Sequence, residues 1–444
     1  MHTTLTTGRT AAKAPPLRHG PGKRRTGRIL VWSLFALLLA TAPLVLRSTL
    51  AVSMLSQIGY LVIVCLSYNI LLGQGGMLSF GHAVYVGLGS FVAVHAINLA
   101  GAGQLPLPLW LIPLVGGLGG LFFAALFGYV STKKSGTTFA MITLGLGELV
   151  AAMALMLPSF FGGEGGVTAD RAYGQLLPGI DFGAQTQVYY LIAVYCFCCT
   201  ALMYAFTGTP LGRMLNAVRD NPERVAFIGY DPQRVRYYAF MVAGFFAGIG
   251  GGLAAINFEI VNASDSLNVL RSGTYLLFTF LGGAGFFFGP IIGAALMVFA
   301  LVLLSELSKA WLLYVGLVFL LTVMFAPGGV ASLIMANLRV AQFGRLHRLY
   351  LPYLGLAAGA ATLLAGLAAT VEMVYHRQFD AALGPMLRLA GWQLDSASAT
   401  TWTLALLLLV AGAAWLELAR RRFARAWDQV QQEIETEIRR QEAA

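Results

Sequence analysis

The sequence predicts an all-α polytopic membrane protein with about 12 transmembrane helices, and two observations on composition carry this prediction. Only 48 of its 444 residues, 11%, are charged, whereas soluble domains average about 25%. The hydrophobic share is 58% and the mean hydropathy is +0.73, which exceeds what one soluble core of this length buries and excludes a disordered chain. The net charge of +10 is therefore expected to report membrane topology, and no nucleic-acid partner is expected.

Long charge-free stretches place the predicted spans. Residues 48–132 contain no Lys, Arg, Asp or Glu, and about three helices of roughly 20 residues fit there. The remaining charge-free windows are 29–46, 182–212, 237–258, 272–305, 310–338, 349–371 and 396–416, and 135–163 is interrupted only by Glu148. Gly289-Pro290 divides one window into two spans, because this dipeptide is typical of a tight turn.

The distribution of basic residues predicts the orientation. If the N-terminus is cytoplasmic and the crossings alternate, the inner segments are 1–28, 131–136, 208–236, 337–348 and 420–444. These segments hold 23 of the 29 Lys and Arg residues. Since cytoplasmic loops are enriched in Lys and Arg, both termini are expected in the cytoplasm.

The basic N-terminus has a second interpretation. Lys23-Arg24-Arg25, an apolar run and Ala40-Thr41-Ala42 also fit a cleavable export signal. The apolar run continues beyond Pro43 to Leu46, which favours an uncleaved anchor.

The sequence lacks the motifs of an enzyme. It has no Gly-x4-Gly-Lys-Ser/Thr phosphate loop and no His-Glu-x-x-His zinc motif, and its six histidines are scattered. The four cysteines lie in apolar spans, where soft packing residues are expected and not a redox or metal site. We therefore expect no catalytic residue, no bound metal and no cofactor.

Two glycine-rich blocks interrupt apolar stretches. The first contains Gly75, Gly76 and Gly81, and the second contains Gly282 and Gly283. Paired interruptions at membrane depth are typical of a translocation path or gate. Short loops between hairpin helices are an equally weighted alternative.

A third glycine pattern predicts helix packing. Gly244, Gly248 and Gly252 recur every four residues and so share one helix face. Small residues at this spacing let two helices approach closely in lipid.

Glu148 is the only acidic residue deep within a predicted span. A carboxylate there costs about 2.5–3.5 kcal/mol, so it is expected to face a partner, a cavity or the bundle interior. A structural or gating hydrogen bond is favoured over substrate contact, and a proton relay stays open.

The longest inner loop, 208–236, alternates apolar and charged residues. Met214, Leu215, Val218, Val225 and Phe227 predict a short amphipathic helix, turned at Asn221-Pro222, that docks on a partner or lies along the membrane.

Four ordered blocks resemble the permease subunits of branched-chain amino-acid ABC importers. The blocks are 68–81, 139–148 with 162–167 downstream, 216–230 with 235–252, and 281–294, while 325–330 resembles the family's closing turn. The resemblance covers about residues 28–335. Glu148 matches the family's intramembrane glutamate, and the residues that match its ATPase-coupling motif are Arg219, Asp220, Asn221, Glu223, Arg224 and Gly229.

The resemblance implies a multi-pass permease subunit in the bacterial cell inner membrane. Such a subunit pairs with a second permease subunit, receives solute from a periplasmic solute-binding protein and is driven by cytoplasmic ABC ATPase subunits, which bind the ATP. Branched-chain amino acids or related small organic compounds are the expected cargo. A self-sufficient channel or secondary transporter for a small neutral solute such as urea is the alternative.

The chain departs from the family pattern at two places. Segment 270–275 and the phenylalanines 286–288 are unusual and lie near the presumed path, which leaves the solute open. The expected organisation is a basic cytoplasmic segment 1–28, a permease domain 29–335, a linker with two extra spans 336–419, and a charged cytoplasmic helix 420–444. That last helix carries Trp427, Val430, Ile434 and Ile438 on one face, which predicts contact with the ATPase or the membrane surface, or a solvated helix.

Overall fold

The computed structural model describes residues 21–172, 182–379, 386–389 and 392–443, and within them the chain is almost entirely helical. The elements of the first half are α1 Pro21–Val45, α2 Thr49–Asn69, η1 Ile70–Gln74, α3 His82–Gly101, η2 Leu109–Leu111, α4 Ile112–Ser131, α5 Gly136–Met156, α6 Pro158–Phe161, η3 Gly163–Gly165, β1 Val167–Thr168, α7 Gln185–Gly208, α8 Pro210–Asp220 and α9 Pro222–Phe227. The elements of the second half are α10 Pro232–Phe258, β2 Ile260–Val261, α11 Ala263–Ser266, α12 Val269–Gly282, α13 Gly289–Val298, η4 Phe299–Leu304, α14 Ser305–Leu307, α15 Trp311–Phe325, α16 Gly329–Gln342, η5 Leu346–Leu349, α17 Tyr350–Phe379, β3 Met386–Leu389, β4 Trp392–Asp395 and α18 Ala399–Ala443.

The helices confirm an α-helical polytopic chain. Within the described residues, nine helices are long and apolar enough to cross a membrane, and the pair α15–α16, bent by 50°, makes a tenth if it is one span. The other two predicted crossings correspond to Ile29–Val45 of α1 and to α12. With 14 residues, α12 is about 21 Å long and shorter than the roughly 30 Å hydrocarbon core. A total of 12 crossings therefore stays a prediction.

Helix α10 lies at the centre of the bundle. In its most apolar window, 78% of the residues are buried within the chain, against 33% for α5 and α7. A Cβ placed on Gly248 would lie only 3.0 Å from the Cα of Gly120 on α4, and one on Gly252 would lie 3.0 Å from the Cα of Pro113. The glycine face of α10 thus lets the backbones of two helices touch, and Gly244 is equally close to the Gly120 carbonyl oxygen.

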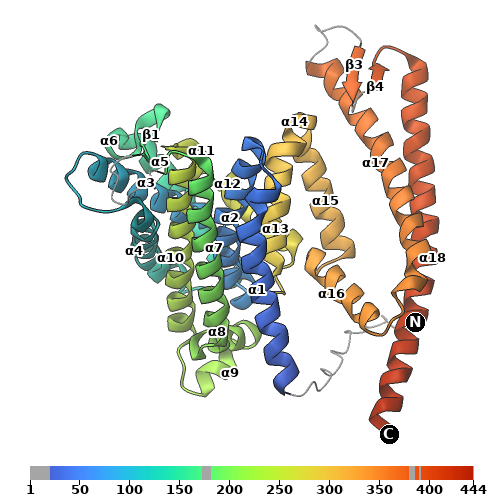
Figure 1. Cartoon of the computed structure of the whole chain (residues 1–444), viewed down its shortest axis with the longest axis horizontal. Coiled ribbons are helices and arrows are strands. Elements are labelled where there is room, and N and C mark those ends of the chain that lie inside the picture. Colours follow the sequence, from blue (N-terminus) through green and yellow to red (C-terminus); the bar gives the residue numbers. More distant parts are fainter. Residues whose placement is uncertain (1–20, 173–181, 380–385, 390–391, 444) are drawn as a thin grey trace, which may run out of the picture.

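The bundle has two distinct ends (Figure 1). Helices α8 and α9 form one end, here called the α8 end, and α6, β1 and α11 lie at the opposite, β1 end. At the β1 end, β1 and β2 pair antiparallel, with Val167 opposite Val261 and Thr168 opposite Ile260. This short ladder fastens the α6–β1 loop to the segment that follows α10.

Helices α17 and α18 form an antiparallel hairpin beside the main bundle, joined through the β3–β4 pair (Figure 1). Helix α18 runs without a break from the predicted span 400–419 through the charged tail. The apolar face of that tail, with Val430 and Ile434 buried, packs against Val340 and Leu349 of the same chain. Part of the linker therefore covers the face for which ATPase or membrane contact was predicted.

Ion pairs reinforce this contact between the linker and the tail. Arg348 Nη1 lies 2.9 Å from Glu433 Oε1, and Arg345 pairs with Glu433 and with Glu437, the latter at 3.2 Å. Basic residues of the predicted inner linker are thus neutralised by acidic residues of the tail.

Glu148 is not the only acidic residue in a long apolar helix. Helix α17 continues beyond the predicted window end at 371 to Phe379, so Glu372 lies within a long apolar helix and is 8% exposed. Its carboxylate accepts hydrogen bonds from Ser308 and, at 3.4 Å, from Tyr314. A buried carboxylate is stable when hydrogen-bonded, so Glu372 fastens the hairpin to α14 and α15.

Substitution of Gly248 with Val tests the central packing. The added side chain has no room against α4 and forces the helices apart. Overpacking of this kind lowers the free energy of unfolding by about 1–3 kcal/mol. We expect a lower midpoint of thermal unfolding in detergent. Gly316 on α15 is the matched control for the same change, because a Cβ added there would have nothing within 4 Å. Equal midpoints for the two variants would contradict the packing role.

Candidate functional site

The loop 208–236 folds as two helices and the start of a third, each begun by the same two-residue signal. The Thr209 hydroxyl accepts a hydrogen bond from the Gly212 N–H at 3.2 Å and caps α8, and Pro210 follows it. Asn221-Pro222 begins α9 and Asp231-Pro232 begins α10 in the same way. A polar N-cap followed by proline at the first helical position is a strong start signal. The sequence prediction of one turned amphipathic helix missed two of these three starts.

Helix α8 is bound to the first glycine block. Asn216 Nδ2 donates to Gln74 Oε1 at 2.7 Å, and the Arg219 guanidinium donates to the carbonyl oxygen of Gly73. Gly76 has a φ of +62° and lies against the Arg219 side chain, so a larger residue would be strained and would collide with it. Polar contacts and close packing therefore join α8 to the end of the α2–η1 helix.

The two glycine blocks touch each other. Gly73 packs against the carbonyl oxygen of Ala284, and Gly283 packs against Gly328 at the start of α16. Both blocks are connections between successive helices, α2–η1 to α3 and α12 to α13, which is the second of the two alternatives considered for them. The structure thus brings α8 and the two connections together in one cluster, the glycine junction, formed by residues 73–76, 216, 219, 283, 284 and 328.

Gly81 and Gly282 allow further close approaches beside this junction. Gly81 lies against the Thr143 carbonyl of α5, where the Phe80 N–H donates to Thr143 Oγ1 at 3.1 Å. Gly282 packs against Gly289 and Gly293 of α13. A gating role for these glycines stays a prediction.

The coupling-motif residues divide into inward and outward groups. Arg219 faces the glycine junction and also lies 3.1 Å from Asp220, while Leu215, Val218 and Val225 are buried in the bundle. The Asn221 side chain caps α9 by accepting from the Arg224 N–H at 2.9 Å.

Residues 223–230 form an exposed tip beyond α8. Phe227 is 88% exposed, although the sequence pattern counted it with the buried Val225 among the apolar residues of one amphipathic helix. Ile228 and Tyr230 are also exposed, together with Glu223 and Arg224, and Gly229 turns the chain with a φ of +91°. Exposed aromatic and aliphatic side chains rimmed by charges are typical of a protein-binding surface.

Glu148 is exposed on the outer surface of α5. It lines a cavity of about 400 Å³ with Asn268 and Val269 of the α11–α12 segment. Within the described residues its carboxylate has no hydrogen-bond partner, so the favoured hydrogen bond is not made inside this part of the chain.

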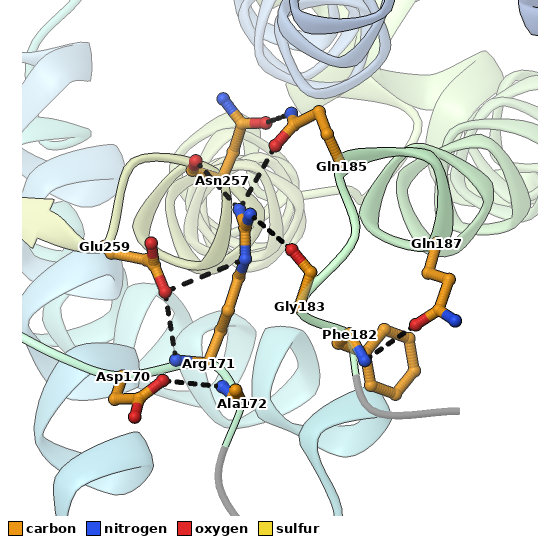
Figure 2. Close-up of polar contacts among 9 residues, drawn as sticks. All are labelled: Asp170, Arg171, Ala172, Phe182, Gly183, Gln185, Gln187, Asn257 and Glu259. Carbon is orange, nitrogen blue, oxygen red and sulfur yellow. Dashed lines mark hydrogen bonds and ion pairs between the residues drawn. The ribbon is translucent and has the colours of Figure 1, made fainter. Parts of the chain in front are cut away.

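Figure 2 shows a polar cluster at the β1 end that the sequence did not predict. The Arg171 side chain, 12% exposed, pairs with Glu259 at 3.7 Å and donates to Gln185 Oε1 at 3.3 Å and to the Gly183 carbonyl at 3.1 Å. Gln185 in turn donates to Asn257 Oδ1 at 2.9 Å. The cluster ties the loop after β1 to the start of α7 and the end of α10. The partners of Arg171 lie 12 to 88 residues from it in sequence, so no local pattern marks them.

The described residues contain no group of three or more His, Cys, Asp or Glu side chains that could hold a metal ion. The features that stand out are instead the exposed tip, the glycine junction behind it and the polar β1 end.

A model of the family described as "Branched-chain amino acid transport system / permease component" matches residues 50–327. The high-affinity branched-chain amino acid transport system permease protein LivM of Escherichia coli is 23% identical over 334 residues, which cover 70% of this chain and 77% of that protein. The probable branched-chain amino acid transport permease protein LivH of Methanocaldococcus jannaschii is 23% identical over 265 residues, 57% of this chain and 82% of that protein. No solved structure matches. Since the matched residues span more than half of the chain, the protein belongs to the permease component family of branched-chain amino acid transport systems.

Proposed function

We propose that this chain is the permease subunit of an ATP-driven ABC importer for branched-chain amino acids or related small organic compounds. The observation that carries the proposal is the exposed tip 223–230, which the buried side of α8 connects to the glycine junction. A partner that binds the tip is thereby linked to the transmembrane helices. The family and the names of its relatives support amino acids as the cargo.

The proposed orientation places the α8 end in the cytoplasm. The segments 208–236, 337–348 and 420–444 belong to the basic inner set, and Figure 1 shows α8, the end of α16 and the C-terminus toward the same end of the molecule. Because basic loops stay on the cytoplasmic side, this arrangement supports 12 crossings of the bacterial inner membrane, with both termini on its cytoplasmic side.

Coupling then follows from two contacts. An ATPase subunit that binds the tip moves α9. Helix α8 moves with it, because α8 ends at Asp220 and the next residue, Asn221, caps α9. The movement reaches α2 and α13 through Arg219 and Asn216, which bind the glycine junction. A few kcal/mol of differential contact between two states suffices to shift the bundle between them.

The exposed face of α5 is where the proposal puts the second permease subunit. Glu148 there has an apolar surround, since Leu149 and Leu155 are 58% and 71% exposed. A carboxylate facing lipid is costly, so a partner subunit that supplies a hydrogen bond would stabilise it.

Reconstitution tests the proposed function. The full chain is reconstituted in proteoliposomes with ABC ATPase subunits, a second permease subunit and a solute-binding protein of the same transport family. We expect it to accumulate leucine only when ATP is supplied on the side of the membrane that carries the ATPase subunits. Liposomes with the chain alone are the control. Uptake by the chain alone, unchanged by the ATPase subunits, would instead establish a channel or secondary transporter.

Charge reversal at Arg219 tests the coupling contact. A glutamate at 219 cannot donate to the buried Gly73 carbonyl, and an unpaired buried acceptor costs about 1–3 kcal/mol. We expect leucine uptake per ATP hydrolysed to fall roughly tenfold while the subunits still copurify. Arg224, exposed on the tip, should behave differently, because its reversal weakens copurification with the ATPase. Arg213→Glu, on the exposed side of α8, is the matched control, and an equal loss there would remove the specific role of Arg219.

Substitutions at Glu148 test whether its side chain forms a hydrogen bond with the second permease subunit. Glu148→Gln keeps a hydrogen-bonding group without the charge, so we expect native copurification of the two permease subunits. Glu148→Leu removes the group and is expected to weaken that association by about 1–2 kcal/mol, roughly 5- to 30-fold in affinity. Met141→Leu on the same exposed helix is the control. Native assembly and uptake in the leucine variant would show that no partner bond exists.

A further inference from the structure

A cavity of about 330 Å³ opens at the β1 end of the bundle. Four helices contribute to its walls, with Tyr60 on α2, Ser90 on α3, Phe258 on α10 and Tyr275 on α12. Its size is at the low end of the roughly 300–1,000 Å³ typical of small-molecule sites. The cavity therefore suits a small solute, and it lies on the face that the proposed orientation exposes to the binding protein.

One pair of oppositely charged side chains, Arg271 and Asp265, lines this cavity. Arg271 Nη2 of α12 lies 2.5 Å from Asp265 Oδ2 of α11, with the side chains 29% and 68% exposed. Arginine presents a planar fork that binds a carboxylate with two parallel hydrogen bonds, and an aspartate carboxylate accepts from an ammonium group. The two side chains together offer one site for a negative group and one for a positive group.

The electrostatics favour a solute that carries both charges. In the unliganded chain Arg271 and Asp265 neutralise each other, so neither charge is left uncompensated beside the apolar walls. A zwitterion that inserts between them replaces one ion pair with two and keeps the net charge at zero. A solute with a single charge forms one ion pair where a zwitterion forms two, so it gains fewer charge-assisted hydrogen bonds from the site.

Polar side chains beside the pair provide further acceptors. The Ser90 hydroxyl donates toward the carbonyls of Val86 and Gly251 at 3.0 and 2.8 Å, which leaves its lone pairs to accept from an ammonium group. Asn262, also in the lining, has a buried amide oxygen with no hydrogen-bond partner among the described residues.

Except for Ser266, the rest of the lining is apolar or aromatic. Val86, Ala254, Ala255 and Val261 surround the cavity, and the rings of Tyr60 and Phe258 meet edge to face at 6.1 Å. An aliphatic side chain would lose water against this surface, at about 25 cal/mol per Å² of apolar area buried.

The Arg171 cluster positions one wall of this cavity. Phe258 and Ile260 flank Glu259, whose φ of +57° turns the chain out of α10, and Glu259 is held by Arg171 (Figure 2). The β1–β2 ladder holds Ile260 and Val261 from the other side. Arg171 is thus a positioning residue for the cavity and does not line it.

We propose that this cavity binds an α-amino acid with an aliphatic side chain, its carboxylate on Arg271 and its ammonium group on Asp265. The proposal rests on the proposed import function and specifies its solute class and its site. It also gives a role to segment 270–275, which departs from the family pattern.

Competition binding on the unaltered protein is the first test. Full-length chain in lipid nanodiscs is incubated with radiolabelled leucine, and three competitors are compared: valine, 4-methyl-2-oxopentanoate, which lacks the ammonium group, and isopentylamine, which lacks the carboxylate. Valine is expected to compete well and the two single-charge analogues roughly 10- to 100-fold more weakly, because each forfeits a charged hydrogen bond. Equal competition by all three, or no leucine binding, overturns the site.

Two variants locate the site. Arg271→Gln and Asp265→Asn are each expected to weaken leucine binding roughly 10- to 100-fold. Arg47→Gln and Glu164→Gln, two exposed charges outside the cavity, are the matched controls and should bind leucine normally. A single symmetric peak in size-exclusion chromatography shows that each variant is folded. If a variant does not fold, the competition series on the unaltered protein still tests the site.

Reconstituted uptake distinguishes failure of the site from failure of the function. If ATP-driven leucine import persists with an unchanged half-saturating concentration in Arg271→Gln, the cavity is not the solute site, and the import function stands. If the unaltered transporter shows no ATP-driven import of any amino acid, the proposed function itself fails.

Discussion

The close approach of α10 to α3 and α4 is the contact on which the rest of the structure depends. Lipid gives helices no hydrophobic reason to associate, so their packing relies on van der Waals contact over small residues. Gly248 meets Gly120 on α4 and Gly89 on α3, so that three backbones share one contact point. The α10 helix begins at the α8 end, directly after the tip, and ends at the β1 end against the cavity, so this one packed helix spans both candidate sites.

The charges of the chain are concentrated where they have partners or water. Arg219 is bound to the glycine junction, Arg171 to Glu259, and Arg271 to Asp265, each at an end of the bundle. Within the long helices, Glu372 is bonded to Ser308 and Tyr314, whereas Glu148 faces outward from α5. The two carboxylates therefore differ in their surroundings, since one is bonded inside the chain and the other lies on the bundle surface.

The C-terminal hairpin shows how a family fold accommodates an extension. The family match ends at residue 327, and α16 follows almost at once. Its residue Val340 packs on α18, whose tail is further held by Arg345 and Arg348. The extension is thus anchored to itself and to α14–α15 at separate points, which leaves the tip 223–230 exposed.

Composition and hydropathy determined the fold class, and the windows between charges located nearly every long helix, because lipid forces each span to be apolar and self-bonded. The Thr-Pro, Asn-Pro and Asp-Pro pairs also encoded the helix starts at 210, 222 and 232. Local pattern did not determine the direction of Phe227, the placement of Glu148 on an outer surface or the contact between Gly73 and Ala284. These three features depend on which faces of distant helices pack together. An apolar helix in lipid has little amphipathic pattern, so its sequence does not show which face will be buried. The Arg171 cluster likewise exists only because tertiary packing brings side chains from separate helices and loops to the same end of the bundle.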